Sequence, residues 1–171
     1  NTNRENVPWI VIFAHRPMYS SNGDDEGHGS DIEFRDAMEI LLYDFQVDLA
    51  IWGHDHHYER TYPVFEENVY SNNSGSMSDP YYKPGATIHI VAGMSGRSAY
   101  DGLVEPKPAW SAYREVAYGY TIFEATKTTI NYKFIRNSDL SIGDEFWITN
   151  TIGIEIPTEI PNNTNNSIND T

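Results

Sequence analysis

The sequence PWIVIFAH occupies residues 8–15, and VDLAIWGH occupies residues 47–54. Each stretch is a nearly continuous apolar run that ends in a histidine. Runs of this kind are typical of strands that are buried on both faces of a parallel sheet. We therefore predict two central strands, one at residues 8–14 and one at residues 47–52.

The segment between these strands is predicted to be an amphipathic helix over about residues 31–46. Its apolar residues recur at helical spacing, at Phe34, Met38, Leu41, Leu42 and Phe45. We expect four of them to be buried against the sheet: Phe34, Met38, Leu41 and Phe45. Ser30 and Glu33 have the Ser-x-x-Glu spacing of a capping box, which would begin the helix. A strand, a helix and a strand in this order form a βαβ unit with parallel strands and a right-handed crossover.

The remainder of the sequence favours β-structure. Residues 88–92 are a further apolar run, and residues 120–124 and 129–134 alternate in the manner of two antiparallel strands. Residues 146–149 are expected to form a last strand at the edge of a sheet. The predicted fold class is α/β (α+β), a βαβ unit followed by antiparallel strands.

The sequence predicts one domain, at residues 1–153. Residues 154–171 are rich in Asn and Thr and are predicted to be a disordered tail or linker. At the other end, the polar stretch from Asn1 to Asn6 leads directly into a strand of central type. We therefore expect this chain to be part of a longer protein.

The composition limits the classes of partner. Asp and Glu outnumber Lys and Arg by 25 to 11 among 171 residues, so the formal net charge is −14. Such an acidic surface repels the phosphates of nucleic acid. No apolar run approaches the ~20 residues that a membrane span needs. The chain has no Cys, so a metal ion would be held by nitrogen and oxygen atoms.

Three histidines lie directly after the two predicted strands: His15 after the first, and His54 and His56 after the second. The carboxyl ends of parallel strands meet at one edge of a sheet, where open α/β folds place their chemistry. Imidazole is a common ligand of zinc, iron and similar metals. The histidines therefore predict a metal site, although a polar turn without a metal would have the same sequence.

Three blocks of the sequence resemble the signature segments of the purple acid phosphatases, which belong to the calcineurin-like metallophosphoesterase superfamily. Residues 14–21 read AHRPMYSS, residues 53–60 read GHDHHYER, and residues 108–120 include PAWSAYRE and YGY. The resemblance extends over about residues 8–150. It implies that the chain is the C-terminal half of a metallophosphoesterase β-sandwich flanked by helices.

The resemblance also implies a dinuclear metal centre. In this family the histidines that correspond to His15 and His54 bind a divalent ion, which can be Zn²⁺, Fe²⁺ or Mn²⁺. The histidine that corresponds to His56 binds Fe³⁺. Family members hydrolyse small phosphomonoesters, because the two ions bind the phosphate and supply the attacking hydroxide.

The sequence departs from the family pattern in one important respect. The other metal ligands of the family come from an Asp, a Gly-Asp-x-x-Tyr block and a Gly-Asn-His-Glu block, and none of these occurs here. The Gly-Asp pairs at residues 23–24 and 143–144 lack a Tyr three residues after the Asp. We expect the missing N-terminal half of the domain to be the partner that supplies them, and this chain alone to be inactive.

Two other functions are compatible with the composition. The first is a phosphatase-like module that binds metal without catalytic activity. The second is a secreted carbohydrate-binding β-domain, which the aromatic residues and Asn-rich loops suggest. The βαβ unit and the position of the histidines argue against the second.

Several further residues are candidates for roles at the site. His28 could protonate a leaving group or donate a hydrogen bond to phosphate, or it could be an exposed loop residue. Arg16 could bind phosphate, or it could form an ion pair at the surface. Asp55 and Glu59 are expected to support the metal ligands or the local structure, by orienting an imidazole or by pairing with Arg60. His57 is expected to lie behind the metal ligands and not to bind metal itself. His89 lies within a strand pattern and is expected to be packed in the core.

Four Asn residues begin glycosylation triplets: Asn72, Asn162, Asn165 and Asn169. Such triplets are accepted as glycosylation sites in secreted proteins. Together with the resemblance, they predict a glycoprotein that is secreted or located in a lysosome or vacuole.

Overall fold

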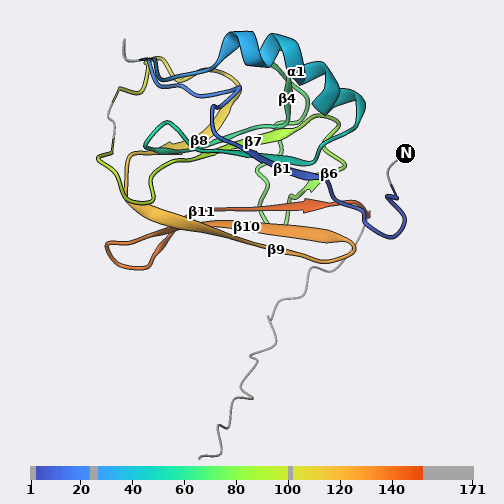
Figure 1. Cartoon of the computed structure of the whole chain (residues 1–171). Coiled ribbons are helices and arrows are strands. Elements are labelled where there is room, and N and C mark those ends of the chain that lie inside the picture. The colour runs from blue at the N-terminus through green and yellow to red at the C-terminus, as the bar shows by residue number, and fades with distance from the viewer. Residues whose placement is uncertain (1–2, 24–26, 100–101, 152–171) are drawn as a thin grey trace, which may run out of the picture.

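The computed structural model describes residues 3–23, 27–99 and 102–151. Its strands form two main sheets that pack face to face, and a single described helix lies against the outer face of the larger sheet (Figure 1). This is the fold class that the sequence predicts. The tail predicted at residues 154–171 lies outside the described residues.

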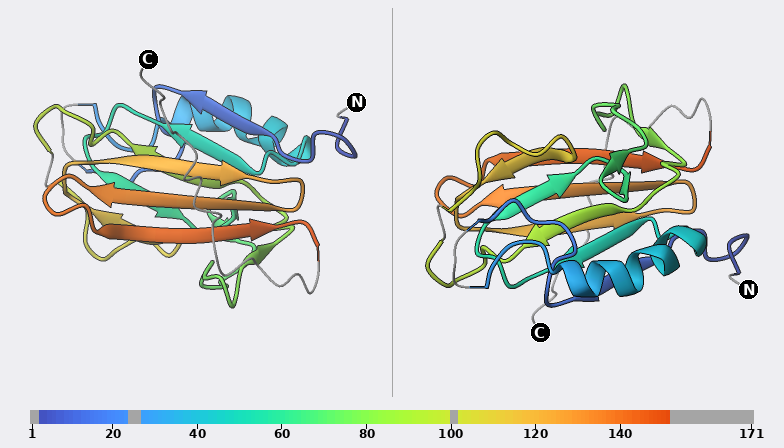
Figure 2. Two further views of the ribbon diagram at one scale, coloured as in Figure 1. Left: turned by 90° about the horizontal axis from the view of Figure 1, so that it is seen from below. Right: turned by 90° about the horizontal axis from the view of Figure 1, so that it is seen from above.

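The larger sheet contains five strands in the order β1-β2-β7-β3-β8. The first three are parallel to one another, whereas β3 is antiparallel to both of its neighbours. The parallel strands place their carboxyl ends at one edge of the sheet (Figure 2). The bounds of the strands are Val11–Ala14 for β1, Leu49–Trp52 for β2, Ile88–Ala92 for β7, Tyr58–Thr61 for β3 and Ser111–Glu115 for β8.

The predicted βαβ unit is confirmed. The helix α1 (Ile32–Asp44) connects β1 to β2, and the two strands pair in register from Val11 opposite Leu49 to Ala14 opposite Trp52. The predicted capping residue is wrong by one position. Asp31 is the N-cap, because its extended backbone lets its carboxylate accept a hydrogen bond from the Phe34 N–H at 3.0 Å.

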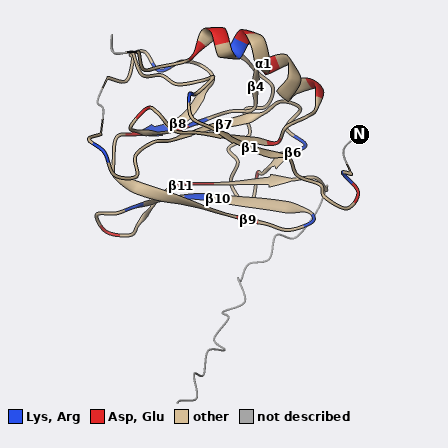
Figure 3. Cartoon of the chain, in the orientation of Figure 1, with Lys and Arg blue, Asp and Glu red and all other residues tan. Residues whose placement is uncertain are grey.

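The predicted buried face of α1 is correct for Phe34, whose ring packs 5.9 Å from that of Trp52, but wrong for the other three residues. Leu41 and Phe45 are 43% and 58% exposed, and Met38 is 36% exposed, whereas Leu42 and Glu39 are buried. Glu39 is buried because it accepts a hydrogen bond from the Tyr19 hydroxyl and another from the Glu66 N–H. This polar contact and the burial of Leu42 set the rotation of the helix about its axis. The outward side of α1 carries acidic residues (Figure 3).

The two apolar runs differ in their burial. All four residues of β2 are buried, as predicted, but Phe13 in β1 is 65% exposed. β1 is the end strand of its sheet among the described residues, so one side of it has no neighbouring strand. The phenyl ring of Phe13 lies 6.5 Å from that of Phe123, which belongs to the end strand of the second sheet.

The second sheet contains four strands in the order β6-β11-β10-β9. The predicted antiparallel pair is confirmed, and β11 continues it. The expectation that β11 is an edge strand is wrong, because the short strand β6 pairs with its outer side. The bounds are Tyr81–Tyr82 for β6, Ile142–Thr149 for β11, Thr129–Arg136 for β10 and Gly119–Ala125 for β9, and a separate hairpin joins β4 (Val64–Phe65) to β5 (Asn68–Val69).

The core lies between the two sheets. The ring of Tyr58 stacks on that of Phe134 with centroids 4.4 Å apart. Beside this stack, Arg60 of β3 forms two hydrogen bonds to the carboxylate of Asp144 in β11, at 2.7 and 3.0 Å. A buried ion pair therefore joins one sheet to the other. Among the described residues, α1 is too short and too polar to cross a membrane.

Candidate metal centre

The histidines that follow β1 and β2 converge beyond the carboxyl ends of these parallel strands. The Nε2 atom of His15 lies 3.1 Å from the Nδ1 atom of His54. The Gly53 N–H donates to the carbonyl of His15 at 3.0 Å, so the two strand ends are joined just before His54. The prediction that His15, His54 and His56 converge in space is confirmed for His15 and His54.

The hydrogen bonds of His54 show which of its nitrogens can act as a ligand. Its Nε2 atom lies 3.3 Å from the carbonyl oxygen of Gly27. A carbonyl oxygen accepts hydrogen bonds and cannot donate them, so Nε2 carries the hydrogen and Nδ1 carries the lone pair. That lone pair is on the nitrogen that faces His15.

His56 is oriented in a similar way. Its Nδ1 atom donates to the carbonyl of Ser98 at 2.9 Å, so its Nε2 atom carries the lone pair. A bond from one ring nitrogen to a backbone carbonyl commonly orients a histidine whose other nitrogen binds a metal. The contacts of the histidines with Gly27 and Ser98 could not be predicted from the sequence, because every residue has a main-chain carbonyl with the same chemistry.

The backbone at His54 has an unusual conformation. Its φ angle is +65°, in the left-handed region that residues with a side chain rarely adopt. The turn is also closely packed, because a Cβ atom on Gly93 would meet the carbonyl oxygen of Asp55 at 2.0 Å. Conformations of this kind persist where surrounding structure enforces them, and they are concentrated at functional sites.

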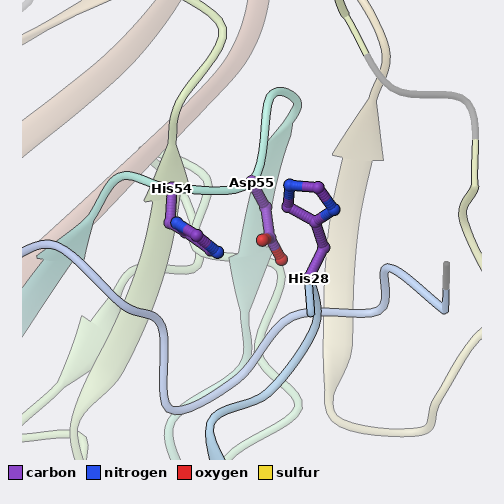
Figure 4. A group of neighbouring side chains, drawn as sticks. All are labelled: His28, His54 and Asp55. Carbon is purple, nitrogen blue, oxygen red and sulfur yellow. The ribbon is translucent and has the colours of Figure 1, made fainter. Parts of the chain in front are cut away.

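His28 joins the cluster from the segment that follows the first block. Its ring centroid lies 5.1 Å from that of His54 and 6.4 Å from that of His56. The carboxylate of Asp55 lies beside His28 and His54 (Figure 4). One potential ligand atom from each of these three residues lies within 4.8 Å of the other two. His28 therefore lies beside His54, whereas the sequence left open whether it would approach the cluster or be an exposed loop residue.

The donor atoms of the cluster fit a metal ion. Two nitrogens that bind one ion at about 2.1 Å each are about 3 Å apart when they occupy adjacent positions around it. His15 and His54 present two nitrogens at 3.1 Å. The Oδ1 atom of Asp55 is buried and has no hydrogen-bond partner among the described residues. Imidazole nitrogen and carboxylate oxygen are suitable ligands for zinc, iron and manganese.

His57 and Glu59 are buried beneath the cluster. The Nε2 atom of His57 lies 3.2 Å from the Glu59 carboxylate, which also accepts from Ser111 Oγ and the Ser21 N–H. Burial by itself would raise the pKa of Glu59, but these hydrogen bonds outweigh it and hold the pKa below its usual value. Glu59 thus contacts the imidazole of His57, which is not one of the predicted metal ligands, and it does not pair with Arg60, which binds Asp144 instead.

Two other predicted residues have clear positions. Arg16 donates to the Gly27 carbonyl at 3.3 Å, the same oxygen that His54 contacts, so its guanidinium lies next to the cluster. His89 is buried in the core, where Trp52 Nε1 donates to its Nδ1 atom at 3.1 Å. Burial, with the charge of Arg35, lowers the pKa of His89 to about 3.

Among the four glycosylation triplets, Asn72 is exposed. Asn162, Asn165 and Asn169 lie outside the described residues.

Comparison with known proteins identifies the family. Residues 1–58 match the family described as calcineurin-like phosphoesterase, and residues 86–145 match the family described as iron/zinc purple acid phosphatase-like protein C. The chain belongs to the purple acid phosphatase family. The chain is therefore related to phosphoesterases of a family that uses metal ions.

Individual relatives agree with this assignment. Acid phosphatase type 7 of Danio rerio is 39% identical over 143 residues, which are 76% of this chain and 31% of the relative. The probable inactive purple acid phosphatase 1 of Arabidopsis thaliana is 31% identical over 153 residues, 87% of this chain and 24% of the relative. The structure of a purple acid phosphatase from yellow lupin seeds superposes with a TM-score of 0.77 at 26% identity, over 89% of this chain and 27% of that one. The chain thus spans about a third or less of the length of these proteins.

Proposed function

We propose that this chain is part of an acid phosphatase that hydrolyses phosphomonoesters at a dinuclear metal centre of Fe³⁺ and a divalent ion, Zn²⁺, Fe²⁺ or Mn²⁺. The observation that carries the proposal is the pair of imidazole nitrogens from His15 and His54, 3.1 Å apart at two parallel strand ends. Membership of the purple acid phosphatase family supports it.

Each residue of the cluster has a role in this proposal. His15 and His54 hold the divalent ion through Nε2 and Nδ1, and His56 holds Fe³⁺ through Nε2. When bound, the two ions attract the phosphate and activate a water for attack on phosphorus. His28 donates a proton to the leaving oxygen, a role that an imidazole commonly takes in catalysis. The Arg16 guanidinium binds a phosphate oxygen.

We propose that the remaining metal ligands lie in a segment of protein outside this chain. The three histidines bring no negative charge to hold two cations together, and no carboxylate of this sequence corresponds to a bridging ligand in the family pattern. The curated relatives are about three to four times as long as the matched region, which leaves room for such a segment. We propose that the whole protein is secreted or located in a lysosome or a vacuole, and the exposed Asn72 triplet supports this location.

The proposal is tested by comparing this 171-residue chain with a longer protein that contains it, both loaded with iron and zinc. The longer protein is expected to hydrolyse a generic phosphomonoester such as p-nitrophenyl phosphate, and the isolated chain is not. Turnover by the isolated chain would show that these residues complete a site by themselves. A longer protein that binds both metals and has no turnover would exclude phosphatase activity.

A second candidate is a metal-binding module without catalytic activity. The resemblance to a protein named probable inactive purple acid phosphatase 1 favours it. In that case the histidines would still bind metal, but no phosphomonoester would be hydrolysed. The same experiment, with metal content measured beside activity, separates the two candidates.

A further inference from the structure

Asp55 is a fully buried acid that lies in sequence between His54 and His56. Its Oδ2 atom accepts a hydrogen bond from the Ser20 hydroxyl and another from the Gly29 N–H, the latter at 3.0 Å. Gly29 directly follows His28. The carboxylate therefore connects the metal-site turn to the residue next to His28.

The backbone after His28 is fixed by further contacts. Gly29 has a φ angle of +98°, and a Cβ atom there would meet the Asn22 carbonyl oxygen at 2.5 Å, so only glycine fits. The Ser30 hydroxyl exchanges hydrogen bonds with the backbone of Ser20, and the Asp31 N–H donates to the Pro17 carbonyl at 2.8 Å. These contacts connect the His28 segment to the residues after β1. Two hydrogen bonds among the described residues connect this segment to the turn of His54 and His56: His54 Nε2 donates to the Gly27 carbonyl before His28, and the Gly29 N–H after His28 donates to Asp55.

We propose that Asp55 is a positioning residue for His28. By accepting hydrogen bonds from Ser20 and Gly29 with one oxygen, it holds the His28 imidazole beside His54, where the phosphate would bind. The proposal deepens the proposed function and rests on it for its kinetic consequences. The position of His28 can be measured independently of any activity.

A carboxylate is suited to this task for a physical reason. Ionised, it only accepts hydrogen bonds, and hydrogen bonds to a charged acceptor are roughly twice as strong as neutral ones. Two donors from different segments converge on a single oxygen of Asp55. A serine at this position would be too short to reach both donors. An asparagine would keep one acceptor oxygen but lose the charge, so its effect should be smaller.

The kinetic experiment uses the longer, metal-loaded protein with the variants Asp55→Ser, Asp55→Asn, His28→Ala and the double variant Asp55→Ser/His28→Ala. Asp79→Asn is the matched control, because the Asp79 carboxylate accepts hydrogen bonds from Ser74 in an exposed loop distant in sequence from the site. We expect His28→Ala and Asp55→Ser each to lower kcat by about tenfold or more, as loss of a positioned proton donor does. The double variant is expected to be no more than about threefold below His28→Ala, because the two changes remove one function.

The outcomes distinguish this role from others. Asp55→Asn is expected to recover part of the lost kcat, and Asp79→Asn to match the unchanged protein. Metal content measured by mass spectrometry is expected to stay the same in Asp55→Ser. Loss of metal would show that Asp55 is itself a ligand, and additive effects in the double variant would show that it acts independently of His28. Either result would overturn the proposal.

A crystal structure of Asp55→Ser gives the readout that does not depend on catalysis. We expect the His28 ring to leave its place beside His54, 5.1 Å away in the unchanged protein, while His15 and His54 stay together. An unmoved His28 would overturn the positioning role. If the unchanged protein has no phosphatase activity, the proposed function fails, and the crystal structure alone decides the role of Asp55. If Asp55→Ser does not fold, Ser20→Ala removes one of the two donors and is expected to lower kcat less severely.

Discussion

The Nδ1 atom of His54 lies 3.1 Å from the Nε2 atom of His15, although 39 residues separate the two in the chain. The reason is the parallel pairing of β1 with β2, which places Ala14 opposite Trp52. The segments that follow these two residues therefore leave the sheet at the same end. The helix α1 spans the intervening sequence and returns the chain to the start of β2. The convergence of the two imidazoles is thus a direct consequence of the βαβ unit.

A first prediction compares two buried or half-buried histidines with different roles. In the longer, metal-loaded protein, His54→Ala is expected to remove about one equivalent of divalent metal and most phosphatase activity, because it takes one of the two nitrogens from that ion. His89→Ala is expected to keep the metal and lower stability, since His89 contacts Trp52 in the core. Metal content, activity and thermal unfolding of both variants check this. Full turnover by His54→Ala would contradict the ligand assignment.

A second prediction concerns the dependence of stability on pH. Burial lowers the pKa of His89 to about 3, whereas a histidine in the unfolded chain has a pKa of about 6.5. Between these values the unfolded state binds a proton that the folded state does not, so the free energy of unfolding falls as the pH falls from 6.5 towards 3. At pH 5 the loss from this residue alone is about 2 kcal/mol relative to pH 7.

The measurement for His89 is urea denaturation at pH 7 and pH 5. His89→Gln keeps an acceptor for the Trp52 indole but does not titrate, so the difference in stability between the two pH values is expected to shrink by about 2 kcal/mol. Glu59 titrates in both proteins and cancels from the comparison. If His89→Gln and the unchanged protein lose the same stability between pH 7 and pH 5, His89 is not the group that causes the loss.

The sequence predicted the parts of the fold that local pattern controls. The two apolar runs and the periodic segment between them were sufficient for the βαβ unit and for the meeting of His15 and His54. The rotation of α1 was not predictable, because apolar residues lie on more than one side of it and the choice depends on the distant contact of Glu39 with Tyr19. The contacts of Asp55 with Ser20 and Gly29 could not be predicted either, because they also join residues that are distant in the sequence.

A third prediction uses adjacent leucines of α1. Leu42 is buried, and Leu42→Ala is expected to cost ~2–5 kcal/mol of unfolding free energy because it leaves a cavity. Leu41 is 43% exposed, and Leu41→Ala is expected to cost less than about 1 kcal/mol in this chain. Denaturant unfolding of the two variants checks the rotation of the helix directly. Equal losses, or a larger loss at Leu41, would show that α1 presents a different face to the sheet.

The fourth prediction concerns the ion pair that joins the two sheets. The Asp144 carboxylate accepts two hydrogen bonds from Arg60 and a third from the Tyr58 hydroxyl at 2.8 Å, and both members of the ion pair are buried. Asp144→Asn leaves the guanidinium of Arg60 buried without a counter-charge, which costs ~3–5 kcal/mol. The neighbouring change Glu145→Gln is the matched control. Glu145 is more exposed and lies 3.5 Å from Lys133, so its loss is expected to cost less than about 1 kcal/mol.

A double variant separates the attraction between the charges from the cost of burying them. Arg60→Met/Asp144→Leu removes both charges and keeps apolar volume between the sheets, so it is expected to recover part of the stability that Asp144→Asn loses. The recovery is partial because the buried hydroxyl of Tyr58 loses Asp144 as its acceptor. The free energy of unfolding of all three variants is measured in urea at pH 7. If the double variant is no more stable than Asp144→Asn, the ion pair stabilises the sandwich through its hydrogen-bond geometry, and charge compensation is not the reason for the loss.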